Sequence, residues 1–156
     1  MKKENADLIY PELSYQIIGI SFKIFNKLGY GFQEKYYQRA FAKEFDIIGL
    51  KYEKEKIINI KYDNKFLGRY LLDFVIDNKI VVELKVRSRL GYVDIKQTLN
   101  YLKTGQYKLA LIIYITKEGV KYRRIINSYI SINSYISDYY GKNKNSTIIY
   151  AVRERH

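Results

Sequence analysis

Two acidic residues and a lysine lie within one short, otherwise apolar segment and are well suited to chemistry. Asp73 is separated from Glu83 by nine residues, and Lys85 follows Glu83 after a single residue. The apolar residues around them alternate, which predicts two strands joined by a turn at 77–79. Because side chains two apart on a strand share a face, we expect Glu83 and Lys85 to point the same way.

The three-residue turn also predicts how the two strands pair. The expected apolar pairs, all on one face, are Leu72 with Leu84, Phe74 with Val82, and Ile76 with Ile80. The same register places Asp73 opposite Glu83 on the other face. Two facing carboxylates repel, and burying them is costly unless a positive charge lies between them. A divalent cation with oxygen ligands supplies that charge, so the segment predicts a metal-dependent active site.

The residue types that are absent exclude several kinds of chemistry. There is no Cys, and the only His is His156, the last residue. Thiolate zinc sites, cysteine nucleophiles and Ser-His-Asp hydrolysis are therefore excluded. Carboxylates, Lys, Tyr, Gln and a hard cation remain for catalysis.

Length and composition predict one globular domain over 1–156. The chain has 156 residues and is 47% hydrophobic, which is enough to bury a core. It contains no apolar run of about 20 residues and begins with a polar segment, so we expect a cytoplasmic protein without membrane contact.

The excess of basic residues favours a polyanionic partner. Lys and Arg number 28 against 16 Asp and Glu, a formal charge of +12, and nucleic acid is the commonest polyanion. The alternative is a proteome bias toward Lys and Asn, which the abundance of Ile and Tyr also fits.

Periodicity predicts an α/β protein with a mixed sheet flanked by helices, in the order α-α-β-β-β-α-β-β. The expected helices are 12–28, 32–48 and 93–104, with Val93, Leu99 and Leu102 facing the core in the last. The expected strands are 51–62, 66–76, 80–87, 107–115 and 120–126. The step from the third strand through the third helix implies a parallel pair with a right-handed crossover. A repeated five-residue segment beginning at Asn127 predicts a helix or helical hairpin, and 147–152 a last strand.

Four motifs in order resemble those of the PD-(D/E)XK nuclease superfamily. Asp73 and Glu83-Leu84-Lys85 match its name-giving motif, although Leu72 stands where the Pro would be. Gly31-Phe-Gln-Glu34-Lys-Tyr-Tyr37 resembles the signature of its prokaryotic GxxExxY branch, and Gln97 to Tyr101 resembles its QxxxY helix motif. The resemblance covers about 13–126, with 127–156 as an extension, and implies a restriction-endonuclease-like core.

The resemblance also implies roles for these residues. Asp73, Glu83 and the backbone carbonyl of Leu84 would hold Mg²⁺ or Mn²⁺, with Glu34 as a third carboxylate. Lys85 would orient the attacking water and stabilise developing charge. Gln97 and Tyr101 would support the site or contact the DNA backbone.

Other roles explain some of these residues equally well. Glu34 suits the first turn of any helix through the helix dipole, and Tyr37 suits a core. Arg69, Arg123 and Arg124 would contact phosphate, but exposed strand edges commonly carry Arg for solubility alone.

The function predicted from the sequence is a metal-dependent DNA nuclease that binds backbone rather than base sequence. The alternatives are a catalytically silent nucleic-acid-binding module, a Holliday-junction-resolvase-like endonuclease, and a basic protein with a protein partner. The sequence leaves open the preferred DNA structure, DNA against RNA, and endo- against exonuclease action. We expect a homodimer through 127–140, whose alternative is that this segment packs on its own sheet.

Overall fold

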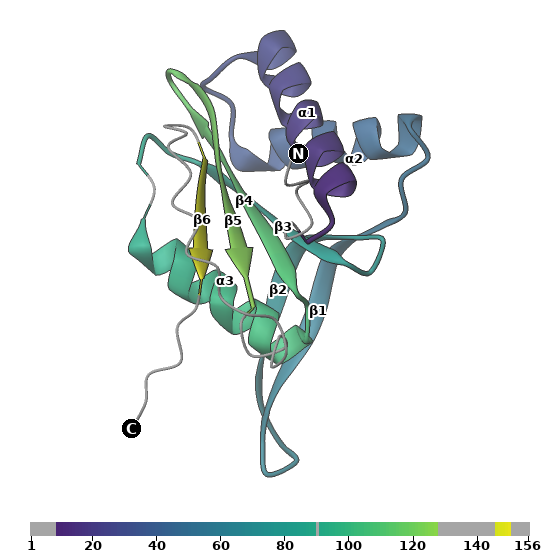
Figure 1. The fold of residues 1–156 in the computed structure, drawn as a ribbon, viewed down its shortest axis with the longest axis vertical. Helices are drawn as coiled ribbons and strands as arrows, with labels where there is room; N and C mark the ends of the chain where they lie inside the picture. The colour runs from purple at the N-terminus through teal and green to yellow at the C-terminus, as the bar shows by residue number, and fades with distance from the viewer. Residues whose placement is uncertain (1–8, 90, 128–145, 151–156) are drawn as a thin grey trace, which may run out of the picture.

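The protein is described from a computed structural model, which defines residues 9–89 and 91–127 in full and the backbone of 146–150. The helices are α1 (Pro11–Leu28), α2 (Glu34–Ile47) and α3 (Tyr92–Gly105). The strands are β1 (Tyr52–Tyr62), β2 (Lys65–Ile76), β3 (Ile80–Val86), β4 (Leu109–Thr116), β5 (Gly119–Ile126) and β6 (Ser146–Tyr150). The element order and the mixed sheet that we predicted are confirmed (Figure 1).

The strands form one sheet in which spatial order equals sequence order, from β1 to β6. Neighbouring strands are antiparallel except for β3 with β4 and β5 with β6. The predicted parallel pair is therefore the one between β3 and β4, and α3 connects its two strands. A crossover of this kind is the connection that a parallel pair requires.

The sheet separates two hydrophobic clusters. One lies between the sheet and the first two helices and includes Ile17 of α1 and Phe41 of α2; the other lies under α3 and includes Leu102. Every residue of β4 is buried, because that strand has helices on both of its faces. This explains its nearly continuous apolar sequence.

The β1–β2 hairpin extends beyond the rest of the sheet (Figure 1). Its turn residues Asp63 and Asn64 have φ values of 45° and 62°, the left-handed conformation that matches the twist of a two-residue hairpin. Tyr62, Phe66 and Leu67 near the turn are exposed. The turn end of this hairpin, which we call the β1–β2 arm, thus contributes little to the core.

One expectation for α3 is wrong, and two others fall outside the described residues. Val93 is 76% exposed, so its predicted core position is wrong: the buried positions of α3 are Asp94, Thr98, Tyr101 and Leu102, and Val93 lies beside that stripe. The predicted helix and dimer contact over 127–140 lie outside the described residues except for Asn127. No helix in the described ranges is long and apolar enough to cross a membrane.

Two helical glycines allow a matched test of this packing. A Cβ at Gly105 would lie 2.6 Å from the Tyr107 ring, whereas a Cβ at Gly19 would have nothing within 4 Å. We expect Gly105→Ala to lower the free energy of unfolding by about 1–3 kcal/mol through overpacking. Gly19→Ala should raise it by about 0.5–1 kcal/mol, because alanine favours the helix. Urea unfolding of both variants checks this, and equal effects would contradict the packing at Gly105.

Candidate active site

The two central carboxylates lie where β2 and β3 stop pairing. The ladder between these strands has three pairs and ends at Phe74 with Val82. This confirms two of the three predicted apolar pairs, whereas Leu72 and Leu84 do not pair. The next positions outward in the same register are Asp73 and Glu83.

Side chains replace the missing ladder bonds at this point. The backbone N–H of Asp73 donates to Glu83 Oε1 at 3.1 Å, and the N–H of Leu84 donates to Asp73 Oδ2 at 2.8 Å. The Glu83 carboxylate therefore binds the backbone of Asp73 itself, and the Asp73 carboxylate binds the backbone of Leu84, the residue after Glu83. The two groups are held close together by the strands that carry them, and both buried N–H groups are satisfied.

The side chains of β2 switch between the two faces of the sheet at Asp73, which corrects the prediction of one apolar face. Leu72 packs in the cluster under α3, whereas Phe74 packs in the cluster under α1 and α2. The partner strand is irregular at the same level, because Glu55 of β1 has a φ of 54° and Asp73 is left out of the β1–β2 ladder. Side chains do not alternate strictly between the two faces here, because the backbone is distorted at the site itself.

Helix α2 brings a third carboxylate and an amide to the same place. Gln38 Nε2 donates to Asp73 Oδ1 at 3.1 Å and to Glu34 Oε1 at 3.5 Å. Tyr37 is fully buried and donates through its hydroxyl to the carbonyl of Gly29, so it anchors the start of the helix. Gln38 was not among the predicted site residues, although its position one turn after Glu34 puts both on one helix face.

Burial and mutual repulsion favour protonation of all three carboxyl groups. Burial, followed by the charge of Asp73, raises the pKa of Glu83 to about 8. Burial also raises the pKa of Asp73 and that of Glu34 above their ordinary values. The charge of Lys85 opposes all three shifts. A site of this kind gains from any further positive charge.

The third helix supports the site from its other face. Tyr101 is 6% exposed and meets the Tyr70 ring edge to face, with 4.7 Å between centroids. Burial, followed by the charge of Glu83, raises the pKa of Tyr101 above its ordinary value. This places Tyr101 beneath the carboxylates as a neutral support. Gln97 is exposed one turn earlier on α3 and, among the described residues, makes no hydrogen bond to these carboxylates.

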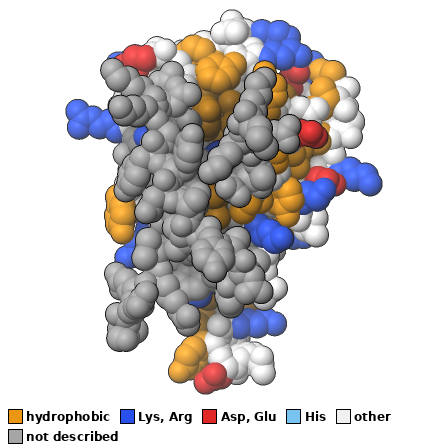
Figure 2. Space-filling view, in the orientation of Figure 1, with side chains coloured by type: hydrophobic (Ala, Val, Ile, Leu, Met, Phe, Trp, Pro, Cys, Tyr) orange, Lys and Arg blue, Asp and Glu red, His pale blue; other side chains and the backbone are white. Residues whose placement is uncertain are grey.

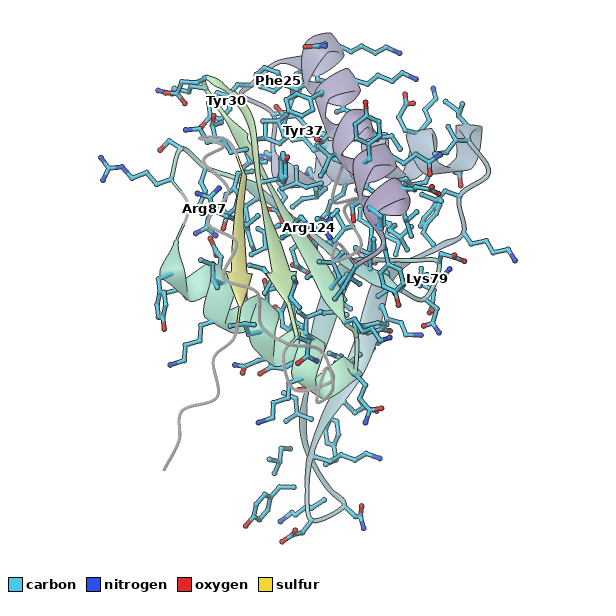
Figure 3. All side chains as sticks on the ribbon, viewed as in Figure 1. Phe25, Tyr30, Tyr37, Lys79, Arg87 and Arg124 are labelled. Carbon is cyan, nitrogen blue, oxygen red and sulfur yellow. The ribbon has the colours of Figure 1, made fainter. Side chains whose placement is uncertain are left out.

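The three arginines predicted to contact phosphate occupy different environments. Arg69 is exposed on the β1–β2 arm and Arg123 is half-buried on β5. Arg124 is 7% exposed and donates to the carbonyl of Ile9 at 2.7 Å (Figure 3). This hydrogen bond gives Arg124 a structural role beside Ile9, just before α1, and its phosphate contact stays a prediction.

The donor set fits a hard divalent cation, although no three Asp, Glu, His or Cys side chains of the described residues form a ready metal cage. Asp73, Glu83 and Glu34 provide oxygen ligands of the type Mg²⁺ prefers. The raised pKa values of the buried pair show a site short of positive charge. Leu84 approaches Asp73 through its N–H, and its carbonyl remains a predicted ligand.

One protein family matches this chain. A family model described as the PD-(D/E)XK nuclease superfamily matches residues 11–125. A solved structure titled "Crystal structure of SSO0001" has a TM-score of 0.48 and 18% identity, covering 78% of this chain and 61% of that one. So distant a likeness carries no argument. No curated protein sequence matches the chain significantly.

The raised pKa of Glu83 predicts how stability depends on pH without metal. The pKa of Glu83 is about 8 in the folded protein against 4.5 ordinarily. The contribution of this residue to the free energy of unfolding is therefore complete below pH 4.5 and is lost as the pH rises through 8. Chemical unfolding in EDTA should show stability falling by about 2–4 kcal/mol over that range. Glu83→Gln should flatten the curve and be more stable than wild type at pH 9.

The exposed Glu12 of α1 provides the control for this experiment. Glu12→Gln should leave the slope of stability against pH as in wild type. Parallel curves for wild type and Glu83→Gln would show that Glu83 holds no extra proton. Added Mg²⁺ should stabilise wild type most at high pH, where the carboxylates are charged.

Proposed function

Since this chain belongs to the PD-(D/E)XK nuclease superfamily, we propose that it is a metal-dependent nuclease that hydrolyses DNA phosphodiester bonds without selecting a base sequence. The observation that carries the proposal is the pair of Asp73, half-buried, and Glu83, buried, which the backbone holds together near Lys85 at the end of the β2–β3 ladder. A structural role alone does not explain why two repelling carboxylates are kept there.

Each residue at the site has its own role in the proposed reaction. Asp73 and Glu83, with the Leu84 carbonyl and Glu34, would hold Mg²⁺ or Mn²⁺, which when bound polarises the scissile phosphate and lowers the pKa of water. Lys85 orients the attacking water and stabilises the negative charge that develops on the phosphate oxygens. Gln38 keeps Asp73 and Glu34 at a fixed separation through its two hydrogen bonds.

The remaining charge supports binding of the DNA backbone. The formal charge is +12, although the site itself is acidic, so the positive charge lies elsewhere on the surface. Figure 2 shows Lys and Arg side chains spread around one face rather than gathered in a single patch. Arg69 and Arg123 are the accessible arginines among those predicted, and such contacts position phosphates without reading bases.

We place the chain in the GxxExxY branch on the strength of Gly31, Glu34 and Tyr37. Glu34 faces the carboxylates through Gln38, and Tyr37 binds the Gly29 carbonyl just before the signature. A junction-resolving endonuclease is the main alternative within the same chemistry. Cleavage of duplex, single-stranded, flap and four-way-junction DNA, and of RNA, with Mg²⁺ or Mn²⁺ separates these substrates.

Substitution of the three central residues tests the activity. Asp73→Ala, Glu83→Ala and Lys85→Ala should each lower cleavage by at least about 100-fold, because each removes a ligand or a charge at the reacting phosphate. DNA binding in EDTA should be retained, and be slightly tighter for the two carboxylate variants, which lose negative charge. Plasmid nicking and fluorescence anisotropy measure the two effects.

Asp77 provides the control, because it lies exposed in the turn at the other end of β2 and β3. Asp77→Asn should cleave like wild type. Comparable cleavage by wild type and all three site variants would show that these residues are not catalytic. Salt-dependent binding by wild type without cleavage would instead support the silent binding module.

A further inference from the structure

A second charged cluster lies beside the carboxylate site and has no part in the chemistry described above. Asp94, in the first turn of α3, is 3% exposed. Its Oδ1 lies 3.1 Å from Arg87 Nη2, and its Oδ2 accepts a hydrogen bond of 3.2 Å from the Tyr114 hydroxyl. One buried carboxylate thus holds two side chains from two strands.

The cluster adjoins Lys85 in the sheet. Tyr114 of β4 is the parallel partner of Lys85, and Ile112 is the partner of Glu83. Adjacent strands are about 4.8 Å apart, and partner side chains lie on the same face. Arg87 directly follows β3, two positions after Lys85, and its charge lowers the pKa of Glu34, as does that of Lys85. Both cations therefore act on the same carboxylate.

Arg87 pairs with a buried acid but is itself accessible. The Asp94 side chain is 4% exposed, whereas that of Arg87 is 47% exposed, so the arginine can meet a ligand from solvent. Arg has five N–H donors in a planar fork that suits phosphate, and Asp94 occupies only part of it. Gly91 at the start of α3 keeps the cluster compact, since a Cβ there would lie 3.3 Å from Asp94 Oδ2.

We propose that Arg87 is a phosphate-binding residue of this site, contacting the nucleic-acid backbone next to the phosphate that is cleaved, and that Asp94 and Tyr114 position it. The inference rests on the proposed function. Asp94 orients the Arg87 guanidinium, and Tyr114 holds Asp94 in place. The N–H groups of the guanidinium that face solvent would then donate to phosphate oxygens. Arg87 would then hold the strand while the carboxylates and Lys85 act on it.

A double substitution separates phosphate binding from charge neutralisation. Arg87→Ala alone leaves Asp94 buried without its cation, and so destabilises the protein whatever else Arg87 does. Arg87→Ala with Asp94→Asn removes one charge of each sign, which keeps the net charge and relieves the buried acid. The Asn side chain still accepts from Tyr114.

We expect this double variant to regain most of the thermal stability lost in Arg87→Ala but to bind DNA about tenfold more weakly than wild type. The slope of log affinity against log salt should fall by about 0.9, the value for one lost phosphate contact on duplex DNA. Anisotropy with labelled duplex and single-stranded oligonucleotides in EDTA measures both. Wild-type affinity and slope in the double variant would overturn the proposal.

Lys79 is a matched control cation at the other end of the same strand (Figure 3). It is 48% exposed and pairs with Asp77 at 2.9 Å, much as Arg87 pairs with Asp94. Lys79→Ala should change DNA affinity less than about twofold, and an effect equal to that of the double variant would also overturn the proposal.

Asp94→Asn alone tests the positioning role. It removes a negative charge and should not weaken binding, but it should slow cleavage of saturating DNA by about tenfold, because Arg87 is no longer held. Unchanged cleavage would reject that role. If wild type binds DNA without cleaving it, the nuclease proposal fails while the binding test still decides on Arg87; if wild type binds no DNA, both fail.

Discussion

Two neighbouring carboxylates, one buried and one half-buried, impose the constraint on which the rest of the structure depends. Asp73 and Glu83 occupy adjacent strands, and each binds the backbone at or next to the other. Burial raises the pKa of both, and for Glu83 the charge of Asp73 adds to it. A sheet can keep such a pair only if its backbone groups are satisfied and its other contacts are strong.

The surrounding elements meet that requirement by fixing the strands on both faces. The buried strand β4 pairs with β3 along its whole length, from Ile80 to Val86, so β3 stays in place where β2 leaves it. Helix α2 holds the free oxygen of Asp73 through Gln38, and α3 packs Tyr101 beneath the pair. The stability of the fold away from the site thus compensates for the strain at the site.

The fold was largely predictable from the sequence, because periodicity, turn residues and the apolar β4 run all report on local structure. The errors have local physical causes. Leu72 was assigned to the wrong face because alternation assumes a regular strand, and the strand is distorted at Asp73. The burial of Arg124 was not foreseen because a sequence does not show which Arg binds a backbone carbonyl. Gln38 was missed because its importance depends on Asp73, 35 residues away.

The distribution of charge shows why the net value alone says little about function. A chain of formal charge +12 brings Asp73, Glu83 and Glu34 together at one place, and the charges of Lys85 and Arg87 both lower the pKa of Glu34. Attraction of a polyanion therefore depends on the surface, whereas the site repels it until positive charge is added there. In the nuclease that we propose, productive approach of a phosphate to this acidic site would therefore require a bound cation. Under the proposed function, dispersed surface lysines would supply affinity for the polyanion, and the few paired residues at the end of β3 would determine where along the strand the chemistry takes place.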